Sequence, residues 1–254
     1  MLIDTTWTTS DNLAYVAMMN DIIGHKQDQF DYTNNMTYDE CCQFLSDNNV
    51  NITTMSLTCN LNIIIDLDKF FTNASLDNDG ILSIKRQTNT SHTHVDIKIK
   101  IDKDRHIGIR LHSNGALQVT GCKYIQDFHN ATTILIDTLT NGNYTSNPTG
   151  ITKSDIKFLL INANLDLGYA IDNTKFYRLL ELCHVKYEIE FRKKSPCHAS
   201  IHIMCPANDE RPSSIFLFPS GSTIITSSSI NHIVTAYHYI KYIESIFGNA
   251  IKIN

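Results

Sequence analysis

The chain repeats one arrangement of strand-like and helix-like segments, and this repeat constrains its fold more than any other feature. Residues 109–123 read IRLHSNGALQVTGCK and residues 215–229 read IFLFPSGSTIITSSS, with a glycine and a threonine at matching positions. The segment LTCNLNI at 57–63 also matches INANLDL at 161–167. A repeat of about 95–100 residues is longer than the unit of a solenoid protein, so we expect a duplicated domain.

Hydrophobic periodicity predicts the elements of each copy. Both copies contain short segments in which apolar and polar residues alternate, as in strands with one buried face. These segments are 81–85, 95–101, 107–112 and 116–121 in the first copy, and 186–191, 200–204, 213–219 and 222–228 in the second. Each copy opens with a strand and a short helix, and each closes with a long helix. The sequence therefore predicts an α+β fold of two pseudo-symmetric repeats, 50–142 and 150–254, with antiparallel sheets and two long helices on one side.

Residues 1–49 differ from both copies in charge. They contain one Lys and eight Asp or Glu residues, a net charge of −7, whereas residues 50–142 are neutral and residues 143–254 carry +2. Ser10 and Asp11 can cap one helix, and Thr37 with Glu40 forms a capping box that starts a second. We expect an acidic, mainly helical N-terminal extension.

The remaining composition excludes several classes of protein. No apolar run approaches the roughly 18 residues that span a bilayer, and the N-terminus lacks the pattern of a signal peptide, so we expect an intracellular protein without a membrane partner. The seven cysteines include no CxxC pair. No phosphate loop, nucleophile elbow or zinc knuckle is present. We therefore expect no enzymatic activity, no cofactor and no metal.

The two glycine–threonine segments resemble the TATA-binding protein family. Each repeat of that family ends in the pattern I-F-x-S-G-x-x-x-x-T-G followed by a long helix. The segment SDIKFLLINANLDLGYAID at 154–172 also aligns without gaps to the opening of the family's second repeat. The resemblance covers about residues 50–250 and leaves the acidic extension outside.

This resemblance implies a saddle, in which a curved antiparallel sheet carries two long helices on its convex side. It implies a transcription initiation factor that binds the minor groove of AT-rich promoter DNA and inserts apolar wedges between base steps. The expected partners are AT-rich double-stranded DNA and general transcription factors or RNA polymerase subunits. The chain is rich in Asn, Ile, Lys and Thr, which indicates an AT-rich coding genome and fits a large DNA virus or a reduced eukaryote. We expect the protein to act in the nucleus or at a cytoplasmic site of viral transcription.

The resemblance also places candidate DNA-binding residues, because alternate side chains of a strand share one face. In the second repeat, Phe216 and Phe218 occupy wedge positions. The other candidates there are Ile224, Thr226, Leu160 and Asn162. In the first repeat Arg110 and His112 stand at the wedge positions. The other candidates of this repeat are Gln118, Thr120, Ser56 and Thr58.

Other interpretations of these residues stay open. The two Phe side chains are compatible with core filling, and the polar residues of the first repeat with a solvated surface. A scaffold that has lost strong DNA binding, or a single-strand binder that stacks bases on the Phe pair, also fits the sequence. The acidic residues 1–49 either fold back over the DNA-binding surface or form an independent docking module.

Overall fold

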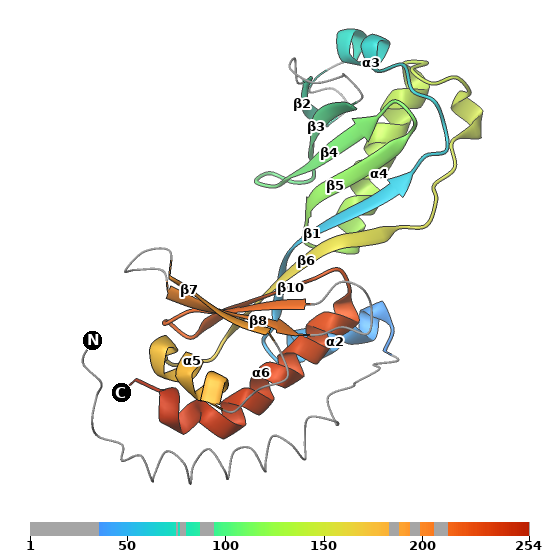
Figure 1. Cartoon of the computed structure of the whole chain (residues 1–254). Coiled ribbons are helices and arrows are strands. Elements are labelled where there is room, and N and C mark those ends of the chain that lie inside the picture. Colours follow the sequence, from blue (N-terminus) through green and yellow to red (C-terminus); the bar gives the residue numbers. More distant parts are fainter. Residues whose placement is uncertain are drawn as a thin grey trace. The chain divides into compact units, whose positions relative to one another are not determined.

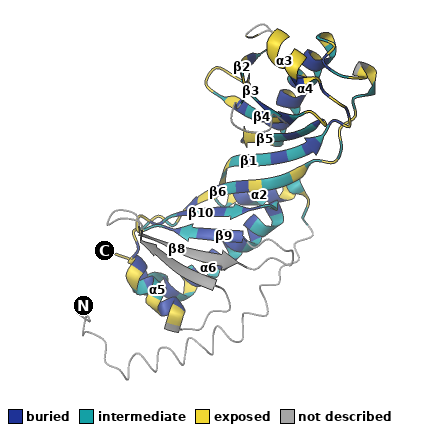
Figure 2. Cartoon of the chain, turned by 45° about the horizontal axis from the view of Figure 1, so that its top comes forward, coloured by how far each residue is buried: buried dark blue, intermediate teal, exposed yellow. Residues whose placement is uncertain are grey.

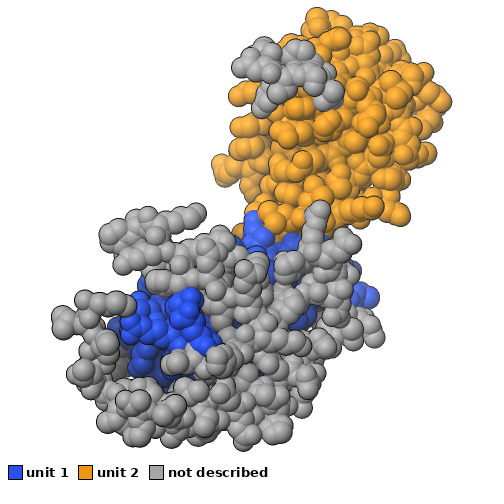
Figure 3. Space-filling view, in the orientation of Figure 1, with its two compact units in different colours: residues 1–51, 162–254 blue, residues 52–161 orange. Residues whose placement is uncertain are grey.

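The structure is a computed structural model that describes residues 36–74, 76, 80–86, 94–182, 188–193, 199–205 and 213–253. For residues 148, 182, 188–193 and 199–205 it describes the backbone alone. The chain divides into two compact units, which Figure 3 shows in different colours. Unit 1 contains residues 1–51 and 162–254, and unit 2 contains residues 52–161. No helix in the described part of the chain is long and apolar enough to cross a membrane.

Unit 2 is a five-stranded sheet with a long helix against one face (Figure 1). Its strands are β1 (Asn51–Asn60), β2 (Ile81–Lys85), β3 (His94–Lys100), β4 (His106–His112) and β5 (Ala116–Cys122), in the order β2-β3-β4-β5-β1. Its helices are α3 (Leu67–Asn73) and α4 (Ile125–Asn141). A short 3-10 helix, η2 (Pro148–Gly150), precedes the next strand.

Unit 1 repeats this architecture. Its strands are β6 (Lys157–Asp166), β7 (Glu188–Lys193), β8 (Ala199–Cys205), β9 (Ser213–Leu217) and β10 (Ser222–Ser227), in the order β6-β10-β9-β8-β7. Residues 157–161 of β6 fall in the range of unit 2, but the whole strand is grouped with unit 1 because β6 pairs with β10. Its helices are α2 (Tyr38–Asp47), α5 (Asn173–Leu182) and α6 (Ile230–Ile251). The α+β class, the alternating strands and the two long helices predicted from the sequence are confirmed.

Alternation along the strands separates a core from an exposed surface in each unit. In β9 and β10, Ile215, Leu217 and Ile225 are fully buried and face α6, whereas the residues between them are only half-buried. Unit 2 follows the same rule, with its buried residues facing α4. The alternation is visible as bands of colour along β1 and β6 in Figure 2. We call the face of each sheet opposite its long helix the open face.

Matching backbone hydrogen bonds define how the two units correspond. The Leu61 N–H donates to the Gly115 carbonyl at 2.9 Å, and the Leu167 N–H donates to the Gly221 carbonyl at 3.1 Å. Both glycines have positive φ, 79° and 85°. Equivalent positions of the two units, such as 115 and 221, are therefore 106 residues apart. This spacing is longer than the predicted repeat of about 95–100 residues.

The correspondence also corrects the match between the opening strands. LTCNLNI and INANLDL are 104 positions apart (161 against 57), whereas the hydrogen bonds require 106. Asn162 thus corresponds to Ser56, and Leu160 corresponds to Thr54. A shift of two residues preserves the face of every side chain, so hydrophobic alternation does not reveal it.

The first described part of the N-terminal extension packs against the helical layer of unit 1. The predicted capping box of Thr37 and Glu40 is present, and α2 ends at Asp47 with Asn48 as its C-cap. α2 lies on α6, where the Phe44 ring contacts Tyr237 with their centroids 5.7 Å apart. Residues 36–49 therefore do not cover the open face, contrary to the fold-back hypothesis for this part. The helix expected after Ser10 lies outside the described residues.

The segment 141–150, which joins the two predicted repeats, is partly built into unit 2. Tyr144 is buried, and its ring meets the Phe70 ring edge-on at 5.4 Å between centroids. The Asp66 N–H donates to the Tyr144 carbonyl at 2.8 Å. The connection between the repeats thus contributes an aromatic residue to the core of the first one.

Gly221 gives a direct test of the turn between β9 and β10. A Cβ at this position would lie 2.0 Å from the Tyr169 carbonyl oxygen, whereas a Cβ at Gly168 would meet nothing within 4 Å. Both residues have positive φ. We expect Gly168→Ala to cost about 1–2 kcal/mol of unfolding free energy through backbone strain alone, and Gly221→Ala to cost clearly more. Thermal unfolding of both variants checks this, and equal losses would contradict the close approach.

Candidate nucleic-acid interface

The open face of unit 1 carries a cluster of partly exposed apolar side chains. Phe216 and Phe218 lie there, half-buried, while their neighbours Ile215 and Leu217 fill the core on the other side. Phe216 pairs directly with Ile224 across β9 and β10. The two Phe side chains are therefore outside the core under α6, unlike the interpretation that they fill it.

Polar side chains continue this face on β10 and β6. The Thr226 hydroxyl donates a hydrogen bond to Oδ1 of Asn162 at 2.9 Å, so these two candidates are brought together. Leu160 is 36% exposed on the same face of β6. Asn164, which sequence reasoning missed, follows on that face and is exposed. The burial alternation of β6 is the signal that could have found it.

The open face of unit 2 is polar and charged instead. Direct cross-strand pairs form a row that runs over all five strands: Lys85, Asp96, Arg110, Gln118 and Thr58. Arg110 Nε donates to Oδ1 of Asp96 at 3.0 Å, and both side chains are more than a third exposed. Arg110 stands where unit 1 has Phe216, since 216 and 110 differ by the repeat spacing of 106. Sequence reasoning missed Lys85 and Asp96, because their place in the row with Arg110 depends on the strand register.

A second row crosses the same sheet beside the first. It contains Ser83, Lys98, Gly108, Thr120 and Ser56. Gly108 allows the Thr120 hydroxyl to approach the backbone, since a Cβ there would lie 2.9 Å from this hydroxyl, which donates to the Gly108 carbonyl at 3.3 Å. The two rows line a hollow of about 280 Å³. The open face of unit 2 thus has a depression, bordered by charged and polar side chains, where a wedge would need a projecting apolar residue.

His112 lies at the end of this face, in direct register with His94. The ring centroids of the two histidines are 5.4 Å apart. His112 is the counterpart of Phe218, so both wedge positions of unit 2 carry groups that hydrogen-bond or ionise. All twelve candidates therefore lie on the open face of their own unit: Phe216, Phe218, Ile224, Thr226, Leu160, Asn162, Arg110, His112, Gln118, Thr120, Ser56 and Thr58.

Basic residues are unevenly distributed over the described surface. Lys85, Lys98 and Lys100 are exposed on the open face of unit 2. Lys123 lies instead at the start of α4, with its ammonium 5.6 Å from the centre of the Tyr124 ring. The described residues contain no group of three or more His, Cys, Asp or Glu side chains placed to hold a metal ion. In the sequence, Cys197 and His198 with His202 and Cys205 form a weak zinc pattern, and the first two lie outside the described residues.

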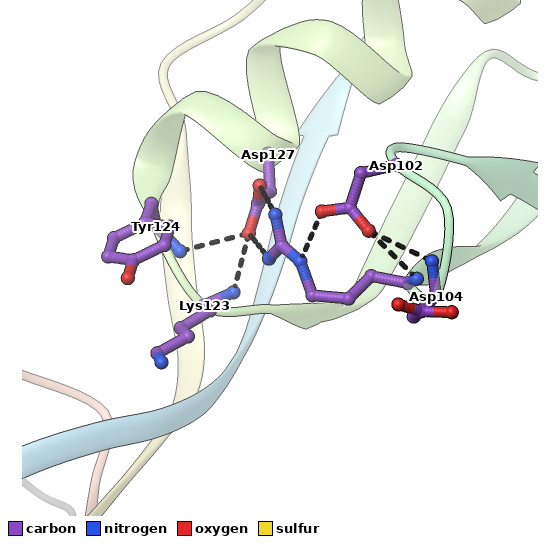
Figure 4. A network of polar contacts seen from close by, with 6 residues as sticks. Asp102, Asp104, Lys123, Tyr124 and Asp127 are labelled. Atoms are coloured by element: carbon purple, nitrogen blue, oxygen red, sulfur yellow. Dashed lines mark hydrogen bonds and ion pairs between the residues drawn. The ribbon is translucent and has the colours of Figure 1, made fainter.

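A buried carboxylate holds the β3–β4 turn against α4 and thereby positions β4 (Figure 4). Asp127 accepts hydrogen bonds from Arg105 at 3.0 Å and 3.3 Å, and from the N–H groups of Lys123 and Tyr124. Burial alone would raise the pKa of the Asp127 carboxyl, but these hydrogen bonds outweigh it and hold the pKa below its usual value. Arg105 also pairs with Asp102 at 2.7 Å.

Asp127→Asn tests this network through the pH dependence of stability. Because the folded pKa of Asp127 lies below its unfolded pKa of about 4, its contribution is present above that pH and is lost as pH falls through the folded pKa. We expect the variant to lose about 1.5–3 kcal/mol of unfolding free energy at neutral pH. The difference from the natural chain should shrink below about pH 4. Denaturant titrations measure both, with Asp137→Asn on the exposed side of α4 as control; a pH-independent difference would contradict the assignment.

Comparison with known proteins identifies what this arrangement resembles. No protein-family model matches the chain. A protein of Acanthamoeba polyphaga mimivirus described as TATA-box-binding protein-like is 33% identical over 277 residues, which cover 92% of this chain and 75% of the relative. The solved structure of Methanococcus jannaschii TBP matches with a TM-score of 0.55 and 17% identity, over 79% of this chain and 98% of that chain. At this identity the archaeal structure shows a common fold and nothing finer.

Proposed function

Since the chain belongs to the TATA-box-binding protein-like family, we propose that it binds the minor groove of AT-rich promoter DNA through its open faces. In this role it acts as an intracellular transcription initiation factor, and it recruits general transcription factors or RNA polymerase subunits. The viral source of the relative agrees with the AT-biased composition of the chain.

The placement of Phe216 and Phe218 carries this proposal. Both Phe side chains are half-buried on one face of β9, while Ile215 and Leu217 fill the core on the other face. Exposed apolar patches of this kind often mark binding sites, so the Phe pair is a surface that a ligand can contact. Insertion of such side chains between base steps costs a few kcal/mol of unstacking per step, and the bent duplex offsets this by contacting more protein surface. Ile224 extends this apolar surface beside Phe216, and Leu160 adds an exposed apolar side chain on β6.

A second candidate function is a protein-interaction scaffold that keeps the fold without binding DNA strongly. The observation that favours it is the Asp96 carboxylate on the open face of unit 2, which neutralises Arg110. Neutralisation of phosphates by Lys and Arg supplies much of the affinity of proteins for DNA. The two repeats together reach a net charge of only +2, which also supports this alternative.

The double variant Phe216→Ala/Phe218→Ala distinguishes these functions. Each lost contact between an aromatic ring and a base is worth about 1–3 kcal/mol, so we expect the Kd for an AT-rich duplex to rise about 30-fold or more. Fluorescence anisotropy with a labelled duplex measures this change. Phe71→Ala is the control, because Phe71 is also a solvent-accessible Phe, 43% exposed, but lies on α3.

Three results would reject the proposed function in different ways. An unchanged Kd for the double variant would remove the Phe pair from the interface. Absence of duplex binding by the natural chain would favour the scaffold. Tighter binding to single-stranded than to double-stranded oligonucleotides would identify a stacking surface for unpaired bases.

Asp96→Asn tests whether the open face of unit 2 takes part in binding. The substitution releases Arg110 from its ion pair and adds one positive charge to this face. We expect tighter duplex binding at low salt, and a slope of log K against log salt that is steeper by about 0.9 for one additional phosphate contact. The control is Asp68→Asn on α3, which also loses an ion pair, to Arg86. Equal effects of both variants would show that only net charge matters.

A further inference from the structure

We infer that the DNA target of this chain is bipartite, with one flexible half that unit 1 kinks and one stiff, narrow-grooved half that unit 2 contacts without kinking. The inference rests on the proposed function and specifies the class of DNA that the two open faces recognise. It follows from the different residues that the two units place at equivalent positions.

Unit 1 has the side chains that a kink requires. Phe216 and Phe218 are apolar, and the buried residues Ile215 and Leu217 fix the strand that carries them. The Ile224 side chain supports Phe216 from the neighbouring strand. Wedges of this kind unstack a base step, and pyrimidine–purine steps such as TA unstack at the least cost. Unit 1 therefore fits a half-site that contains TA steps.

Unit 2 lacks a wedge at both equivalent positions. Arg110 replaces Phe216 and is held by Asp96 at 3.0 Å, and Gln118 replaces Ile224 beside it. Insertion of this pair between stacked bases would remove two charges from water, which costs several kcal/mol per ion after relaxation of the protein. The hollow of about 280 Å³ between the two rows leaves no projecting apolar group to take over this role.

The same face fits a narrow minor groove. A-tracts are stiff, and their narrow groove has an enhanced negative potential that attracts Arg, Lys and His side chains. Three exposed lysines, Arg110 and the His94–His112 pair share this face with the single carboxylate of Asp96 in the two rows. Gln118 and Thr120 add groups that can donate to the acceptors on A·T base pairs.

A consequence is that the protein binds such a target in one orientation. Two equivalent half-saddles would bind a duplex equally well after exchange of the halves. Here the exchange would place the Phe pair on a stiff A-tract and the charged face on TA steps. The order of the two halves in the DNA therefore determines the direction in which the chain is bound.

The experiment compares three duplexes of equal length that carry a donor and an acceptor dye at their ends. One joins a TA-step half to an A-tract half, one joins two TA-step halves, and one joins two A-tract halves. Anisotropy gives the Kd, and energy transfer gives the bend on binding. We expect the mixed duplex to bind about 5- to 100-fold more tightly than the duplex with two A-tracts. The bend should be equal on the mixed duplex and on the duplex with two TA halves, because only one half is kinked in either case.

The variant Arg110→Phe/His112→Phe installs the residues of unit 1 at the equivalent positions of unit 2. It should bend the duplex with two TA halves more than the mixed duplex, through a second kink. If this variant does not fold, the bends that the natural chain produces on the three duplexes still test the inference. A larger bend by the natural chain on two TA halves than on the mixed duplex would overturn the inference, and so would binding without any bend. In both cases the proposed function stands, whereas absence of binding to all three duplexes rejects the proposed function together with this inference.

Discussion

The packing of α4 and α6 against one face of each sheet decides which side chains can contact a ligand. In the strands whose side chains are described, alternate residues turn toward the helix and form a core, as Ile215, Leu217 and Ile225 do under α6. The residues between them are placed on the open face by the geometry of a strand. The composition of the open face is therefore set by strand register, and a change at one position of that face leaves the core intact.

The two units share this constraint but use it differently. Matching hydrogen bonds around Gly115 and Gly221 show that the backbone repeats closely. The open faces have diverged, with Phe216 in one unit and the Arg110–Asp96 pair in the other. The backbone is shared between the two units, whereas the open faces differ. This difference is expected if the core determines the fold and the open face determines binding. The acidic α2 lies on the helical side of unit 1, where it buries part of α6 and leaves the open face uncovered.

The sequence was sufficient to predict the strands, the long helices and the face on which each candidate lies, because hydrophobic periods report burial directly. The family that the resemblance suggested is also the one that the comparison shows. Three features were out of reach. The two-residue displacement of β1 against β6 preserves the faces, so only hydrogen bonds reveal it. The Asp96–Arg110 contact depends on the pairing of β3 with β4, and the docking of α2 on α6 depends on tertiary packing.

The central claim is that DNA occupies the open faces, and methyl NMR with an AT-rich duplex tests it most directly. The methyl groups of Leu160 and Ile224 report on the open face of unit 1, and those of Ile215 and Ile225 report on the core behind it. We expect large shifts and protein–DNA contacts for the first pair, and small shifts for the second. Perturbations confined to residues of α2, α4 and α6 would place the DNA on the helical side and contradict this account.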